Sequence, residues 1–168
     1  MALRDALLPE LDQELATTRA VLAAVPEAKT SFRPHKKSWT LGELSLHVAN
    51  VLTWLPITLR STELDLSPPG GPSFVPPTFE SARATLEAFE GNARAARAAL
   101  AAATDAELAV PWTLKRGGQP LFTLPRSACL RSFVMNHLIH HRGQLTVYLR
   151  LMDAKVPAIY GASADYPA

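Results

Sequence analysis

The chain has 168 residues, of which 48% are hydrophobic and 19% are charged. This composition excludes a disordered chain and fits one globular domain, residues 1–168, with a sizeable buried core. The net charge is only +2, and the basic residues are scattered without a cluster or interleaved aromatic residues, so nucleic acid is not an expected partner. The single cysteine, Cys129, excludes an intrachain disulfide and a metal site built from several cysteines.

No apolar run of the sequence is long enough to cross a bilayer, so we expect no membrane partner. The first residues, MALRDALLPELDQEL, form an amphipathic segment that carries acidic residues early, which does not match a signal peptide. We therefore expect a cytoplasmic protein.

The first half of the chain predicts two helices with apolar residues at helical spacing. The first helix runs from about Leu3 to Val25, and a polar connection over residues 26–38 follows it. The second begins after Trp39, where Thr40 and Glu43 have capping-box spacing, in which each side chain bonds the free backbone N–H of the other residue. Pro56 should bend this helix, because proline removes one backbone hydrogen bond.

The second half predicts a long loop, a hairpin and two further helices. Residues 67–77 are rich in proline and glycine, which indicates a loop. Thr78 can cap a third helix ending near Ala103, and residues 105–124 indicate a small hairpin or irregular excursion around two glycines. The fourth helix runs from about Pro125 to Met152, and residues 156–168 form an ordered, extended tail. Four amphipathic helices with one long crossover predict an all-α fold, a four-helix bundle.

Two histidines, His137 and His141, lie in the most regular amphipathic stretch, the fourth predicted helix. A buried polar ring is penalised unless its nitrogens find partners, so a pair of histidines on a core stripe requires an explanation. Two histidines one helical turn apart can bind the same metal ion, and His47 on the stripe of the second helix can supply a third ligand. We therefore predict that His47, His137 and His141 bind one divalent metal ion.

Helix geometry separates His140 from this set. His140 lies about 60° from His137 and about 100° from His141 around the helix axis, at the edge of the apolar stripe. The alternative interpretation is that these histidines are core or interface residues held by hydrogen bonds, which is the expectation for any one of them alone. No glutamate directly follows His137, so the helix motif of zinc proteases is absent.

Three residues near the histidines are candidates for orienting a ligand or binding a substrate. They are Gln144, Arg142 and Asn50, although each could equally be a surface or interface group. Three nitrogen ligands leave a fourth position open, which is the layout of a catalytic metal site. Such a ligand set suits zinc or nickel, and also copper or iron. No carboxylate lies on either histidine stripe, so the sequence assigns no catalytic residue.

Three segments together resemble the DinB/YfiT-like family of metalloenzymes: residues 39–47 (WTLGELSLH), 136–150 (NHLIHHRGQLTVYLR) and 156–165 (VPAIYGASAD). The damage-inducible proteins of this family share a name with a DNA polymerase but not its fold or chemistry. The resemblance spans nearly the whole chain. It implies an up-down-down-up bundle, usually a homodimer, with a metal on three histidines that map onto His47, His137 and His141. It also implies a low-molecular-weight thiol as a possible cosubstrate.

These observations are compatible with functions of different classes. The first is a metal-dependent transferase or hydrolase, in which the ion activates a thiol or water for transfer to a small electrophilic substrate. The second is a non-catalytic, stress-linked dimer that binds a small ligand or a partner. A third is that the histidines are remnants and the site is empty. The same fold accommodates all of them, because function depends on the site and not on the fold.

Overall fold

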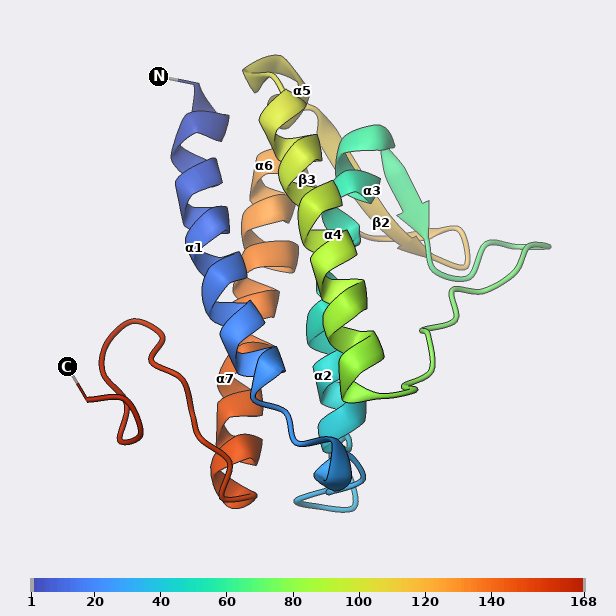
Figure 1. Cartoon of the computed structure of the whole chain (residues 1–168). Coiled ribbons are helices and arrows are strands. Elements are labelled where there is room, and N and C mark those ends of the chain that lie inside the picture. Colours follow the sequence, from blue (N-terminus) through green and yellow to red (C-terminus); the bar gives the residue numbers. More distant parts are fainter. Residues whose placement is uncertain (1, 168) are drawn as a thin grey trace.

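Long helices that run side by side dominate the computed structural model, which describes residues 2–167 (Figure 1). Helix α1 (Leu3–Ala23) contacts α4 (Ala82–Ala102) and α7 (Asn136–Leu151), and α2 (Leu41–Val51) contacts the same two helices. The apolar faces of these helices therefore meet around one core. In the described part of the chain, no helix combines the length and the apolar character needed to cross a bilayer.

Shorter elements connect the long helices. In chain order they are the 3₁₀-helix η1 (Glu27–Lys29), α3 (Trp54–Arg60), β1 (Glu63–Asp65), α5 (Asp105–Ala109), β2 (Pro111–Arg116), β3 (Gln119–Pro125), α6 (Arg126–Cys129) and the π-helix η2 (Leu130–Met135).

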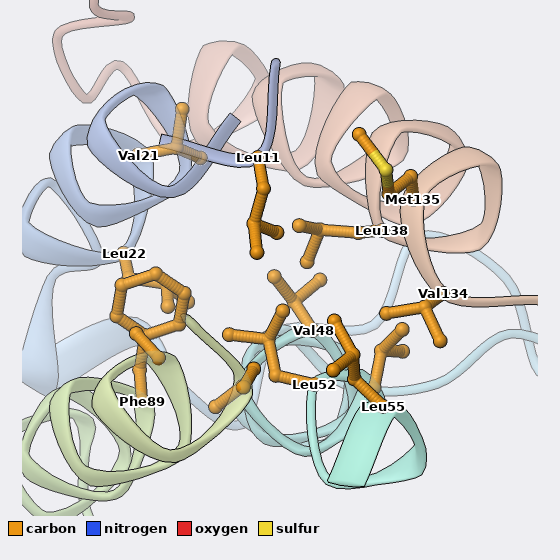
Figure 2. Close-up of a cluster of buried hydrophobic side chains, with 14 of the residues drawn as sticks. Leu11, Val21, Leu22, Val48, Leu52, Leu55, Phe89, Val134, Met135 and Leu138 are labelled. Atoms are coloured by element: carbon orange, nitrogen blue, oxygen red, sulfur yellow. The ribbon is translucent and has the colours of Figure 1, made fainter. Parts of the chain in front are cut away.

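The core consists of aliphatic and aromatic side chains from all the long helices (Figure 2). Leu11 of α1, Val48 of α2, Phe89 of α4 and Leu138 of α7 are all buried almost completely. Burying one such side chain stabilises the fold by about 1.5–3 kcal/mol. The apolar spacing in the sequence therefore predicted the faces that meet in this core.

Side-chain caps define where two of the helices begin. Thr40 Oγ1 accepts a hydrogen bond from the Glu43 backbone N–H at 3.1 Å, and Glu43 Oε2 accepts one from the Thr40 N–H at 2.7 Å, which confirms the predicted capping box. The cap of α4 is Ser81, whose Oγ accepts from the Ala84 N–H at 3.0 Å. The prediction that Thr78 caps this helix is wrong, because the chain stays extended past Pro76 and Pro77 as far as Ser81.

Pro56 produces a break between two helices rather than a gentle bend. Helix α2 ends at Val51 and α3 begins at Trp54. In a helix interior, the ring of Pro56 would clash with the carbonyl of Leu52, four residues earlier, so the break falls there. Pro56 then lies in the first turn of α3, where the missing N–H would have no intrahelical acceptor.

A mixed sheet packs against α3 and α6, and it shows that the predicted all-α, up-down-down-up four-helix bundle is wrong (Figure 1). The strand order is β1-β2-β3, with β2 parallel to β1 and antiparallel to β3. The β2–β3 hairpin itself was predicted, and it turns at Gly117 and Gly118, which have φ values of 62° and 78°. Strand β1 has three residues, too few to show the alternation that identifies a strand in a sequence. The fold is therefore mixed, with helices and a sheet.

A second, smaller apolar cluster lies beneath the sheet. It contains Trp112, Leu114 and Cys129. The indole N–H of Trp112 donates a hydrogen bond to Ser61 Oγ at 3.2 Å, so the buried ring has its polar atom satisfied. Burial raises the pKa of the Cys129 thiol, so this residue behaves as a small buried side chain rather than as a nucleophile.

The last predicted helix is helical along its whole length but changes type. It begins as α6, widens into the π-helix η2 over Leu130–Met135, and continues as α7 from Asn136. A π-helix has hydrogen bonds between residues five apart, and such segments are rare and occur frequently at functional sites. In this chain the π-helix ends two residues before His137.

Candidate metal centre

The predicted histidines come together between two helices. His47 lies on α2, and His137 and His141 lie one turn apart on α7. Each offers a ring nitrogen, and these three nitrogens all lie within 4.8 Å of one another. The Nε2 atoms of His47 and His137 are 3.1 Å apart. Since imidazole nitrogens bind zinc at about 2.0–2.1 Å, a cluster of this size can hold one ion with small side-chain movements.

Hydrogen bonds fix how two of these rings face the cluster. His141 Nδ1 lies 2.7 Å from Gln144 Oε1, which can only accept, so Nδ1 donates and Nε2 is the nitrogen left for a metal. His137 makes a hydrogen bond with the backbone of Phe133. Partners on the second nitrogen are typical of metal-binding histidines, because they select the tautomer and the ring orientation.

Burial keeps these histidines neutral. It lowers the pKa of His47 to about 4, with a further contribution from the neighbouring rings of His141 and His137. The pKa values of His137 and His141 are also lowered, again mainly by burial. A metal binds only the unprotonated ring, so all three residues are in the required state at neutral pH without first losing a proton.

The histidines lie at the margin of the core and not in its middle. The fully buried positions of α7 are Leu138, Arg142, Leu145 and Leu149, so the buried stripe passes one residue beyond His137 and His141. Both histidines are half-buried. The apolar stripe predicted from the sequence therefore differs by one residue from the buried stripe of the structure. This difference leaves the ring nitrogens of His137 and His141 accessible from a cavity. His140 is exposed and does not belong to the cluster, as its helical angle predicted.

Trp39 forms a wall of the site that sequence reasoning did not assign. Its ring lies 4.6 Å from the ring of His47 and 5.5 Å from that of His141. Its backbone carbonyl accepts a hydrogen bond from the Tyr148 hydroxyl at 3.2 Å, which ties this segment to α7. The sequence places Trp39 directly before the capping box, but it does not show that the indole ring turns toward the histidines.

Two hollows adjoin the histidines. A cavity of about 710 Å³ is bordered by His47, His137 and Asn50, and a hollow of about 450 Å³ is bordered by His141 and Gln144. Trp39 lines both. The cluster is therefore reachable by small molecules, and the larger cavity falls within the range of ordinary ligand sites, about 300–1,000 Å³.

The supporting residues predicted from the sequence have different positions. Gln144 contacts His141 directly. Asn50 lines the larger cavity, and its Oδ1 accepts a hydrogen bond from Asn92 Nδ2 at 3.4 Å. Arg142 instead faces α1, where its guanidinium pairs with Glu14 at 2.6 Å and bonds Thr17 at 2.5 Å. The structure therefore brings Gln144 and Asn50 to the site and directs Arg142 into the protein interior.

Comparison with known proteins agrees with this arrangement. A family profile described as the DinB superfamily matches residues 10–145. The chain belongs to the DinB superfamily. The matched region includes His47, His137 and His141, the members of the candidate metal centre in this DinB-superfamily protein.

Solved structures show the same fold. A DinB-like protein from Bacillus cereus is 25% identical, with a TM-score of 0.69, and the match covers 93% of this chain and 97% of that one. A DinB-like protein from Bacillus subtilis is 18% identical, with a TM-score of 0.68 and coverage of 97% and 99%. The search of curated proteins found no match. The family profile therefore establishes the family and these structures support the fold, and the function must be argued from the site.

Proposed function

We propose that this DinB-superfamily protein is a metal-dependent enzyme that activates a thiol or water for transfer to a small electrophilic substrate. The observation that carries the proposal is the convergence of three neutral histidine nitrogens beside a cavity. His47, His137 and His141 would hold a divalent ion, with zinc or nickel the best suited to three imidazole ligands. When bound, such an ion lowers the pKa of a coordinated thiol or water and so supplies a nucleophile at neutral pH.

The residues around the cluster support this chemistry in separate ways. Gln144 orients the ring of His141 through its 2.7 Å hydrogen bond. Trp39 covers the rings of His47 and His141 and limits the access of water to one side of the cluster. The Asn50 side-chain NH₂ remains as a donor for a substrate oxygen, since its Oδ1 already accepts from Asn92.

The lack of a free carboxylate at the larger cavity, among the residues that the structure describes, favours thiol activation over hydrolysis. Apart from the two histidines, Glu43 is the ionisable side chain in this set. Its carboxylate caps α2 through the Thr40 N–H, which also lowers its pKa and keeps it charged. Arg33 pairs with the same carboxylate at 3.3 Å. A thiol bound to a metal needs no further base, whereas many metal-dependent hydrolases use a free carboxylate for proton transfer.

The same cavity supports the second candidate, a non-catalytic protein that binds a small ligand. One experiment separates the two functions. The purified protein is assayed with a panel of low-molecular-weight thiols and aromatic or alkyl electrophiles, then stripped with a chelator, and finally reconstituted with zinc or nickel. The enzyme proposal expects turnover that is lost on chelation and returns with the metal. Ligand binding without metal-dependent turnover of any pair would contradict it and favour the binding protein.

A further inference from the structure

The larger cavity extends well beyond the histidine cluster. Its volume is about 710 Å³. Helix α2 lines it with Leu46 and Asn50, and Trp54 at the start of α3 also borders it. The extended segment between β1 and α4 contributes Phe74 and Phe79. A space of this size, much larger than an ion and its water ligands, indicates a site for a molecule with a substantial body.

The walls of this cavity are mostly aromatic, aliphatic and proline side chains. The rings of Trp54 and Phe74 face each other edge to face with centroids 6.4 Å apart. Phe79 packs directly on α2 at Gly42, where a Cβ atom would lie 2.8 Å from the phenyl ring. Glycine at position 42 is therefore what lets this ring lie against the helix and form the wall. Such surfaces stabilise apolar groups and stack well on rings.

The charges at the rim of the cavity also bear on the kind of molecule that it can bind. Among the described residues that border the cavity, none is a lysine or an arginine. The carboxylate of Glu43 is held by the α2 cap and by Arg33, so it is not available as a counter-ion for a bound cation. A charged group placed beside Trp54, Phe74 and Phe79 would lose its hydration without gaining a partner, which is costly. An anion would find a partner in this cavity only at an ion held by His47 and His137.

From these observations we propose that the cavity binds the uncharged, ring-containing body of the electrophilic substrate. The reacting atom lies toward His47 and His137, and the apolar body lies between Trp54, Phe74 and Phe79. This inference rests on the proposed function for the reaction itself, but the binding of an uncharged aromatic molecule can be measured separately. Electrophiles with an uncharged aromatic or alicyclic body are then the substrate class.

Two fluorescent probes with one ring skeleton test this directly. N-phenyl-1-naphthylamine is uncharged, and 8-anilinonaphthalene-1-sulfonate adds one sulfonate to the same rings. We expect the uncharged probe to bind the full-length protein at one saturable site, both with metal and after the metal has been removed with a chelator. In the metal-free protein the sulfonate should bind at least about tenfold more weakly than the uncharged probe, because no lysine or arginine among the described residues borders the cavity to pair with its charge. Equal or tighter binding of the sulfonate to the metal-free protein overturns the proposal.

Substitutions locate the probe. Phe74 is half-exposed, so Phe74→Ala does not threaten folding and should weaken binding of the uncharged probe by about two- to tenfold through loss of ring contact. The neighbouring Val75 is 79% exposed and does not border the cavity, which makes Val75→Ala the matched control with unchanged affinity. Leu46→Trp, which fills the cavity from α2, should abolish binding. Unchanged affinity in both Phe74→Ala and Leu46→Trp would place the probe elsewhere and overturn the proposal.

Metal content measured on the same samples keeps the two proposals separate. Protein that contains metal but does not bind the uncharged probe overturns the substrate class and leaves the metal-dependent function standing. Protein that binds the probe in the expected way but contains no metal, even after reconstitution, overturns the metal-dependent function and leaves the cavity as a binding site for uncharged aromatic molecules.

Discussion

Adjacent residues of α7, His141 and Arg142, belong to two polar clusters with opposite properties. His141 faces His47 and His137, and the cluster contains no opposite charge. Arg142 faces α1, where it is 1% exposed and pairs with Glu14 at 2.6 Å. The hydroxyl of Tyr160 accepts from Arg142 at 2.7 Å and donates to Glu14 at 2.8 Å. The Arg142 cluster contains its own counter-charge, whereas the histidine cluster contains none.

The comparison shows how a binding site differs from a structural polar core. A buried charge is stable when its counter-charge and hydrogen bonds are all supplied by the protein, as they are for Arg142. The histidine cluster contains no counter-charge: the Nε2 atoms of His47 and His137 lie 3.1 Å from each other, and burial lowers the pKa of all three histidines. Ionisable side chains that converge on one point and have shifted pKa values are typical of functional sites, so the predictions below test each cluster separately.

The largest expected effect is a loss of stability when the cluster around Arg142 is disrupted. Glu14→Ala removes the counter-charge of Arg142 and should lower the free energy of unfolding by about 3–5 kcal/mol. This is the usual cost of leaving one member of a buried ion pair without its partner. Chemical denaturation of the two proteins measures this. The exposed pair of Arg83 and Glu87 provides the control, since Glu87→Ala should change stability by less than about 0.5 kcal/mol. A similar small loss for both substitutions would show that the Arg142 cluster is not structural.

A smaller effect is expected at the histidine cluster, where the exposed Gln144 contacts His141. Gln144→Leu removes the hydrogen bond to His141 Nδ1 and should weaken metal affinity by about 10–100-fold, as for other partners of metal-binding histidines. Stability of the metal-free protein should hardly change, because Gln144 is exposed. Competition with a chromogenic chelator measures the affinity. Unchanged affinity would mean that His141 does not depend on this contact to bind the metal.

In metal-free protein, the histidine cluster should also make the free energy of unfolding depend on pH. The pKa of His47 is about 4 in the folded state and near 6.5 when the chain unfolds. Between these values the unfolded chain binds more protons, so the free energy of unfolding should fall as the pH drops from about 6.5 toward 4. Above pH 7 this contribution should be constant.

Denaturation at pH 7, 6 and 5 measures this slope, and His47→Gln should reduce it. The remaining slope would come from His137 and His141, whose pKa values are lowered in the same direction. An identical slope in wild type and His47→Gln would contradict the burial of His47 as the cause.

The sequence predicted the histidine cluster better than the Arg142 cluster, for a physical reason. His137 and His141 are related by helical spacing, and the capping box at Thr40 sets where α2, and so His47, begins. These are local patterns. The partner of Arg142 is Glu14, 128 residues away, and nothing local indicates which of the two faces of α7 the arginine side chain takes.

The same limit explains what the sequence left unpredicted in the fold. Strand β1 is defined by its pairing with β2, some 50 residues later, and not by its own three residues. The π-helix before His137 shifts the buried stripe by a change in hydrogen bonding that apolar spacing does not show. The loop residue Phe79 becomes a cavity wall only because it meets Gly42 on α2.

The most direct test of the account is the metal content of purified protein by mass spectrometry, compared between wild type, His137→Ala and His140→Ala. His137 belongs to the cluster, whereas His140 is the adjacent, exposed histidine outside it. The account predicts about one equivalent of a divalent metal in wild type and in His140→Ala, and its loss in folded His137→Ala, as expected for removal of one of three protein ligands. A wild-type protein that cannot be loaded with metal, or equal metal in all three proteins, would contradict it.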